Sequence, residues 1–173
     1  MSEKFSVSME SPQSGWMSLR LRAGRRQFVA VVSHAPYDSL RELIEGLTAL
    51  LEGAGSVVIR WNAEPEEYDF ELRAEGDDTL SLSVVRYEGH RRAPAGKRTD
   101  FNWRGPRVEA CLPFWRELRS MRARSETDVF EQNWRRAFPL RELRGLTEAL
   151  KIHAPADMSD TTGHQSGGGN PPS

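Results

Sequence analysis

The side chains best suited to acid–base chemistry are four carboxylates in the middle of the chain, Glu64, Glu66, Glu67 and Asp69. Paired carboxylates can serve as the general acid and the general base of one reaction. The sequence also allows a simpler interpretation. Glu64, Glu66 and Glu67 would belong to a tight, solvated strand connection. Asp69 and Glu71 alternate with apolar residues of the strand that follows, which would place them on its solvated outer face. We therefore favour a surface that binds a partner over a catalytic acid–base pair.

The chain reverses its charge between two neighbouring segments. Residues 42–80 carry eleven carboxylates and two arginines, whereas residues 88–107 carry six basic groups and two acidic ones. The formal net charge of the whole chain is only −1. Segregated charge creates local fields that steer partners. The acidic segment favours a protein partner, with a basic partner surface as one option.

Residues 88–105 lack periodicity and are rich in Gly, Pro and Arg, which predicts a long basic loop. Basic side chains are interleaved there with aromatic ones, a pattern typical of proteins that bind single-stranded nucleic acid. The residues concerned are Arg91, Arg92, Lys97, Arg98, Phe101, Trp103 and Arg104. We expect Trp103 to be exposed. The competing interpretation is a solvated loop, or a loop whose arginines fold back onto the acidic strands. A net charge near zero also argues against a dedicated nucleic-acid-binding domain.

Other reactive groups give little support to an enzyme. No pair of histidines has a spacing typical of metal ligands. Cys111 falls on the apolar stripe of a predicted helix, which favours a buried apolar residue over a nucleophile. Gly53 and Gly55 follow a helix and precede a strand, the reverse of the order that directs a helix N-terminus at a phosphate. The sequence leaves enzymatic activity open but leans against it, and it predicts no cofactor and no metal.

Alternating patterns predict the strands that would position these residues. The segments 17–21 and 28–32 flank Gly24, which suits the first central position of a type II′ turn. That turn would pair Leu21 with Phe28. Three more strands are expected within residues 57–61, 68–75 and 80–85. A three-residue loop at 76–78 would align Phe70 with Val84, keeping the apolar residues of both strands on one face.

Helical spacing predicts the remaining elements. Ser39 and Glu42 have the spacing of a capping box before an apolar stripe that runs to Leu51. The last third of the chain, from Pro106, reads as three helices separated near Ser125 and Pro139. We expect an α+β domain over residues 1–152. It would have an antiparallel sheet of about five or six strands, one helix between strand runs, and a C-terminal helical segment packed on it.

Composition sets the remaining boundaries. Residues 153–173 are rich in Gly, Ser, Thr, Pro and Asp, which predicts a disordered tail. The longest apolar run, Phe28–Val32, is far shorter than the roughly 20 residues that span a bilayer. Met1–Ser11 has no signal-peptide pattern, and the single cysteine, Cys111, excludes an intrachain disulfide. We expect a cytoplasmic protein without membrane contact, and the oligomeric state stays open.

Two local patterns carry a resemblance. Trp61 precedes an acidic-proline turn and a tyrosine, Glu64-Pro65-Glu66-Glu67-Tyr68, and Trp134 opens a W-x3-F-P-x3-L pattern that ends at Leu143. With this layout the chain resembles small bacterial α+β proteins, some of which look like immunity proteins that neutralise toxins by stoichiometric binding. The resemblance implies a non-catalytic protein that binds another protein. The alternatives are a nucleic-acid-associated protein that uses residues 88–107 and, third, an enzyme with scattered acidic residues.

Overall fold

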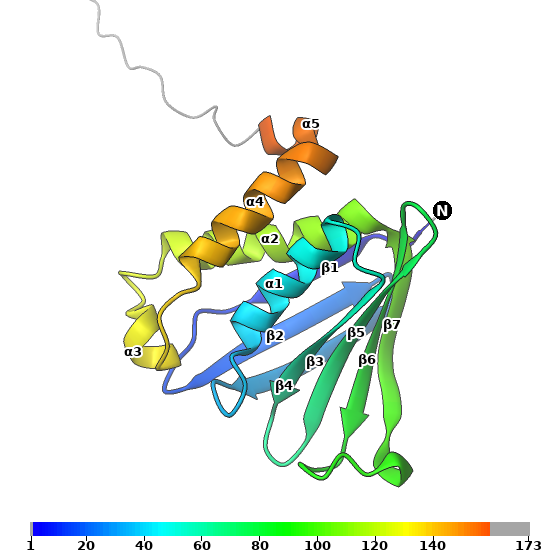
Figure 1. The fold of residues 1–173 in the computed structure, drawn as a ribbon. Helices are drawn as coiled ribbons and strands as arrows, with labels where there is room; N and C mark the ends of the chain where they lie inside the picture. Colours follow the sequence, from blue (N-terminus) through cyan, green and yellow to red (C-terminus); the bar gives the residue numbers. More distant parts are fainter. Residues whose placement is uncertain (1, 160–173) are drawn as a thin grey trace, which may run out of the picture.

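The alternating segments form one antiparallel sheet in which the strand order follows the chain order, β1 to β7 (Figure 1). The computed structural model describes residues 2–159. The strands are β1 (Phe5–Met9), β2 (Trp16–Ala23), β3 (Arg26–Ser33), β4 (Ser56–Asn62), β5 (Glu67–Glu75), β6 (Thr79–Tyr87) and β7 (Arg98–Pro106). The helices are α1 (Ser39–Leu51), α2 (Arg107–Ala123), α3 (Phe130–Trp134), α4 (Leu140–His153) and α5 (Pro155–Ser159), with a 3-10 turn η1 at Pro94–Gly96.

The two predicted hairpins form with the expected registers. In the first, Leu21 pairs with Phe28, and Gly24 has the positive φ, 57°, that the turn requires. In the second, Phe70 pairs with Val84 across a three-residue loop. The predicted α+β class is therefore confirmed, with one helix between strand runs and helices at the C-terminal end.

The sheet has seven strands rather than five or six, because β1 and β7 were not predicted. The expectation of a loop over residues 88–105 is wrong from Arg98 onward. There Phe101, Trp103 and Gly105 alternate inward and pair with β6. Trp103 is only 3% exposed, so the prediction of an exposed tryptophan is also wrong. Its Nε1 donates to the carbonyl oxygen of Glu3 at 2.7 Å.

The sheet divides between β3 and β4, which pair only at Ser33 and Asn62. Helix α1 is inserted in the chain at this point and packs on β4. Gly46 allows the close approach, because a Cβ there would lie 3.3 Å from a methyl group of Val57. Figure 1 shows α1, α2 and α4 gathered at one end of the sheet, above the fan of β4–β7. Apolar side chains of these helices and of the strands form one core.

The predicted capping box is wrong. Asp38 is the N-cap of α1 and makes no side-chain capping bond. Ser39 and Glu42 instead form hydrogen bonds with backbone groups at the unpaired edge of β4. The Ser39 hydroxyl donates to the carbonyl oxygen of Arg60 at 2.6 Å, and the Glu42 carboxylate accepts the backbone N–H of Arg60 at 3.1 Å. These two side chains therefore bond to backbone groups of β4 that have no partner on β3, instead of capping the helix.

Helices α2 and α4 begin directly after the predicted prolines, Pro106 and Pro139. The helix expected from Ser125 is shorter than predicted, because turns occupy residues 124–129 and α3 starts only at Phe130. Helix α4 extends to His153 and α5 to Ser159, and Ala154 between them is buried. The helical region therefore runs past the boundary predicted at residue 153. The rest of the predicted tail lies outside the described residues. Within residues 2–159, no helix combines the length and the apolar character needed to cross a bilayer.

Candidate functional site

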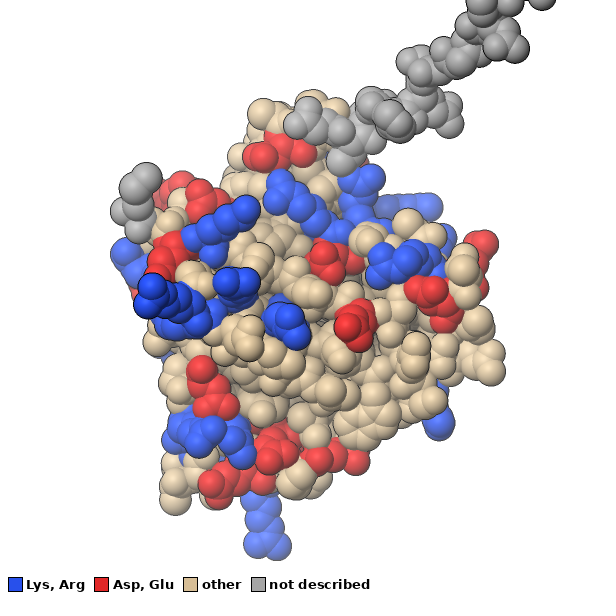
Figure 2. All heavy atoms as spheres, turned by 180° about the vertical axis from the view of Figure 1, so that it is seen from behind, with Lys and Arg blue, Asp and Glu red and all other residues tan. Residues whose placement is uncertain are grey.

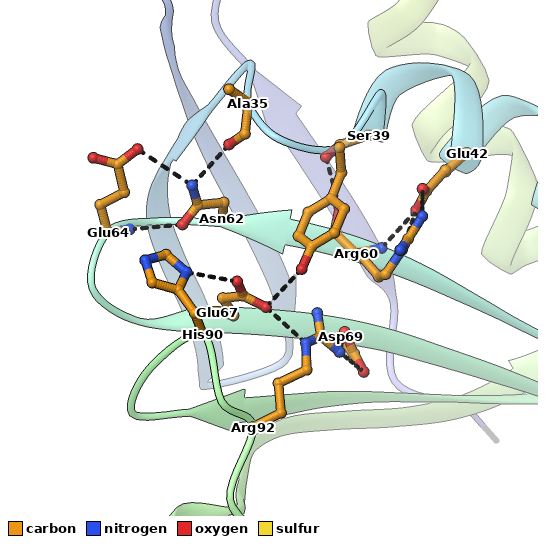
Figure 3. A network of polar contacts seen from close by, with 11 residues as sticks. Ala35, Ser39, Glu42, Arg60, Asn62, Glu64, Glu67, Asp69, His90 and Arg92 are labelled. Atoms are coloured by element: carbon orange, nitrogen blue, oxygen red, sulfur yellow. Dashed lines mark hydrogen bonds and ion pairs between the residues drawn. The ribbon is translucent and has the colours of Figure 1, made fainter.

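The most extensive polar site lies at the start of β5, where loop 88–97 folds back onto the strand (Figure 3). We call it the carboxylate–arginine site and define it as Glu67, Asp69, Arg92, His90 and Tyr37. Arg92 Nε donates to Glu67 Oε2 at 2.7 Å. Arg92 Nη1 lies 2.7 Å from both oxygens of Asp69. One guanidinium therefore joins two carboxylates.

The strand brings the two carboxylates together. Glu67 and Asp69 are two positions apart on β5, so both side chains leave the same face of the sheet. They are 1% and 6% exposed. The prediction of solvated surface carboxylates is therefore wrong for these two residues. Charged groups are this deeply buried only when they are paired and hydrogen-bonded, and Arg92 meets that condition.

Two further side chains form hydrogen bonds with the carboxylate of Glu67. His90 Nδ1 lies 2.9 Å from Oε1, and the Tyr37 hydroxyl donates to Oε2 at 3.0 Å. Tyr37 comes from the loop between β3 and α1, so the site joins three separate parts of the chain. The Tyr37 ring also faces two cations, with the guanidinium carbon of Arg60 at 4.3 Å from its centroid and that of Arg92 at 5.7 Å.

Asn62 holds the neighbouring connections in place. Its Nδ2 donates to the carbonyl oxygen of Ala35 at 2.7 Å and to Glu64 Oε1 at 3.3 Å. Its Oδ1 accepts the backbone N–H of Glu64 at 3.1 Å. These bonds tie the loop that carries Tyr37 to the turn that precedes Glu67, as Figure 3 shows. The buried amide therefore positions two parts of the site.

The environment moves the pKa values of the two carboxyls in opposite directions. Burial alone would raise the pKa of Glu67, but hydrogen bonds from His90, Arg92 and Tyr37 lower it. Burial dominates at Asp69 and raises its pKa, although Arg92 opposes the shift. Burial and the adjacent Glu67 raise the pKa of Tyr37. Glu67 is thus held in its charged form, which suits binding of a cation better than proton transfer.

The predicted partner-binding residues do not form one free charged surface. They are Glu64, Glu66, Glu67, Asp69, Glu71, Arg91, Arg92, Arg98, Trp103 and Arg104. Apart from the three in the site, most form ion pairs within the chain. Glu66 lies 3.2 Å from Arg86, Glu71 lies 3.5 Å from Arg73 and 3.8 Å from Lys97, and Arg98 lies 2.7 Å from Asp100. Arg104 pairs with Glu75.

The charge reversal is therefore largely neutralised inside the molecule, and of the two alternatives for the basic loop, Arg92 and Lys97 follow the one in which basic side chains fold back onto the acidic strands. Glu64 and Arg91 are exposed, and Arg91 forms no hydrogen bond or ion pair with any residue in the described part of the chain. Sequence reasoning missed Tyr37, Tyr87 and Arg60. The register of the predicted hairpin already sets Tyr87, whose ring centroid lies 5.0 Å from the guanidinium carbon of Arg92, opposite Glu67. No local signal in the sequence brings Tyr37 to the site.

A second candidate surface lies on the uncovered face of β2 and β3. Trp16, Val29 and Val31 are exposed there by 36%, 48% and 52%. One edge of β3 pairs with β2, whereas the other edge meets β4 only at Ser33. At Val29 and Val31 this second edge therefore has no strand partner among residues 2–159. Figure 2, seen from behind, shows a broad area without charged side chains, bordered by both basic and acidic groups.

The strand register connects these two surfaces. Trp16 pairs with Ser33, Ser33 with Asn62, Asn62 with Glu67 and Glu67 with Tyr87. Directly opposed residues share a face of the sheet. The row therefore runs from the apolar surface to the carboxylate–arginine site over three strand spacings, about 14 Å measured along the sheet.

Within residues 2–159, neither a cluster of metal ligands nor an activated thiol is present. No group of three or more His, Cys, Asp or Glu side chains within residues 2–159 could hold a metal ion. Burial raises the pKa of Cys111 to about 12, which agrees with the predicted apolar role of this thiol.

No protein-family model, curated protein or solved structure matches the chain.

Proposed function

We propose that this chain is a non-catalytic protein that acts by stoichiometric binding to another protein, in the manner of immunity-type proteins. The observation that carries the proposal is the exposed row of Trp16, Val29 and Val31 beside the unpaired side of β3. Tryptophan is enriched among the residues that dominate binding energy at interfaces. Proteins commonly guard unpaired strand edges with charges, prolines or covering elements. At the start of β3, Arg26 donates to the carbonyl oxygen of Asn102 on β7 at 2.7 Å, whereas the exposed side chains of Val29 and Val31 carry no charge.

The size of the surface is consistent with one interface. The apolar row and the carboxylate–arginine site lie on the same face of the sheet and are joined by the register through Ser33 and Asn62. A typical stable interface buries about 800 Å² on each partner, and a patch of that area would include both. The proposed location is the cytoplasm, because Cys111 is a lone buried thiol and the described fold uses no disulfide.

The nucleic-acid alternative has less support. Arg92, Lys97 and Arg98 each contact carboxylates of the same chain, and Trp103 is buried and so cannot stack on a base. The partner is accordingly proposed to be a protein. A basic partner surface would have to contact Glu67 and Asp69, and both carboxylates bind Arg92 in this structure.

The proposal is tested by comparative capture from cells that make the protein. Tagged wild type is compared with Val31→Lys, which places a charge on the proposed interface, and with the matched control Ile152→Lys, which changes an exposed aliphatic side chain on α4. We expect wild type and the control to retain one protein at fixed stoichiometry after nuclease treatment. We expect Val31→Lys to lose that protein without a change in melting temperature. Retention by Val31→Lys, or a recovery that nuclease abolishes, would refute the proposal.

A further inference from the structure

The guanidinium of Arg92 occupies a pocket that belongs to other parts of the fold. Glu67 and Asp69 of β5 bind its Nε and Nη1, each at 2.7 Å. The ring centroids of Tyr87 and Tyr37 lie 5.0 and 5.7 Å from its central carbon. Two carboxylates and two aromatic rings thus surround one planar cation, which is delivered by loop 88–97.

We propose that Glu67, Asp69, Tyr37 and Tyr87 form a binding site for a guanidinium group, in which Arg92 is the chain's own exchangeable ligand. An arginine of a bound protein would then take the place of Arg92. Only this exchange rests on the proposed protein-binding function. The site itself is a property of the isolated chain.

The geometry selects arginine over lysine. A guanidinium is a planar fork of five N–H donors, whereas an ammonium is a compact point charge. Arg92 uses that fork, with Nε on one carboxylate and Nη1 on both oxygens of the other. Guanidinium groups also stack on aromatic faces, and Tyr37 and Tyr87 provide such faces. A lysine side chain could not contact both carboxylates in this manner.

The attachment of the loop favours exchange. No residue of segment 88–97, all of which the structure describes, is buried. Its backbone hydrogen bonds stay within the loop, from Arg92 to Gly89, from Gly96 to Ala93 and from Lys97 to Pro94. Its hydrogen bonds to β5 run through the side chains of His90 and Arg92. Withdrawal of the loop would therefore expose little apolar surface.

Two features of Arg92 itself agree with this interpretation. Its side chain is still 25% exposed, whereas those of Glu67 and Asp69 are 1% and 8% exposed. The arginine therefore enters from the solvent side and covers the carboxylates. Its φ of 49° lies in the left-handed region, which is unfavourable for a residue with a Cβ. An incoming arginine free of this constraint could bind the same carboxylates.

An empty site would strongly favour a replacement cation, because an uncompensated buried charge is far less stable than a paired one. This provides a test that needs no partner protein. Arg92→Ala removes the resident ligand and leaves the pocket walls. The probe is methylguanidinium chloride, and the readout is the melting temperature followed by circular dichroism.

We expect methylguanidinium to raise the melting temperature of Arg92→Ala in a saturable manner, by about 3–6 °C at about ten times its dissociation constant. Methylammonium chloride at the same concentrations should give a smaller increase. Wild type, whose pocket is filled, should show no saturable increase. Neither should the triple variant R92A/E67Q/D69N, which lacks both carboxylates. Equal effects of the two cations, or equal effects on the single and triple variants, would overturn the proposal.

If Arg92→Ala does not fold at neutral pH, the same titration is made on R92A/D69N, which leaves only one carboxylate without a cation. Saturable stabilisation of this variant that is lost on adding Glu67→Gln would support the site, and its absence would refute it. These outcomes are independent of the capture experiment. Failure of the titration removes the guanidinium site, whereas failure of the capture removes the protein partner.

Discussion

The carboxylate of Glu42 accepts hydrogen bonds from both the backbone N–H and the side-chain Nε of Arg60, at 3.1 and 3.3 Å. Arg60 lies on β4 at the edge that β3 leaves open. A helix side chain therefore takes the place of a missing strand. This relationship shows how the fold tolerates the division of its sheet, and it leads to the first prediction.

Glu42→Ala should lower the free energy of unfolding by about 1–3 kcal/mol, because a backbone donor loses a charge-assisted acceptor. Glu45→Ala is the matched control. It removes an exposed glutamate of the same helix and should change stability by less than about 0.5 kcal/mol. Urea unfolding of the two variants measures the difference. Equal stabilities would mean that water replaces Glu42 at no cost.

Leu47→Ala should destabilise the protein by about 2–5 kcal/mol, the range found for buried leucines. Leu47 lies in the middle of α1 and is fully buried. Ile152→Ala serves as the control, because that side chain is exposed on α4. A loss below about 1 kcal/mol for Leu47→Ala would show that α1 contributes less to the core than its burial indicates.

Glu67→Gln should reduce stability at neutral pH and have progressively less effect in acid. The folded protein lowers the pKa of Glu67 below its ordinary value of 4.5. A carboxyl with a lowered pKa stabilises the fold above its unfolded pKa, and this stabilisation is lost as the pH falls through the folded value. Unfolding of wild type and variant at neutral pH and below pH 4.5 measures the difference. A gap that widens in acid would contradict the assignment.

Asp69 should behave with the opposite sign. Its pKa is raised above the ordinary value of 3.8, so the folded state takes up a proton more readily than the unfolded state. Ionisation of Asp69 then costs stability as the pH rises through its folded pKa. The wild-type protein should therefore lose less stability in acid than Glu67 alone would cause. Asp69→Asn should steepen the acid limb of the stability profile, and an unchanged limb would contradict this prediction.

The thiol of Cys111 should be unreactive in the folded protein. The pKa of about 12 leaves almost no thiolate at pH 8, and the side chain is fully buried in α2. Because the chain has one cysteine, a thiol-specific chromogenic disulfide should report no fast reaction in buffer and one equivalent in urea. Stoichiometric reaction of the native protein within minutes would contradict the burial of this helix face.

The sequence allowed prediction of those parts of the fold that depend on local pattern. The hairpins at Gly24 and Gly76 could be placed because alternation on both sides admits one register. Strand β7 was missed because glycine, proline and arginine in residues 88–98 suggested a loop that continued through Phe101 and Trp103. Ser39 and Glu42 had the right spacing for a capping box, but the division of the sheet gave them other acceptors and donors.

The candidate site was predictable only in part. Glu67, Asp69 and Arg92 were all named as binding residues on the basis of charge. That they bind one another depends on the return of loop 88–97 to β5, which has no local sequence signal. Tyr37 was missed for the same reason, since it reaches Glu67 from a different connection. Charge patterns identify the groups, whereas tertiary structure decides whether those groups face solvent or each other.

The order of the strands also has a consequence for synthesis of the chain. Most neighbouring strands are joined by short connections, so each can pair with the one made just before it, and the entropy lost in closing each loop is small. Contacts between the two ends of the chain form later. Trp103 reaches Glu3 across 100 positions, and Glu117 binds the backbone N–H of Met9 across 108. The sheet can therefore grow hairpin by hairpin on the ribosome, with β1 pairing with β2 early, whereas the hydrogen bonds that join the N-terminal segment to β7 and α2 form only after α2 has emerged.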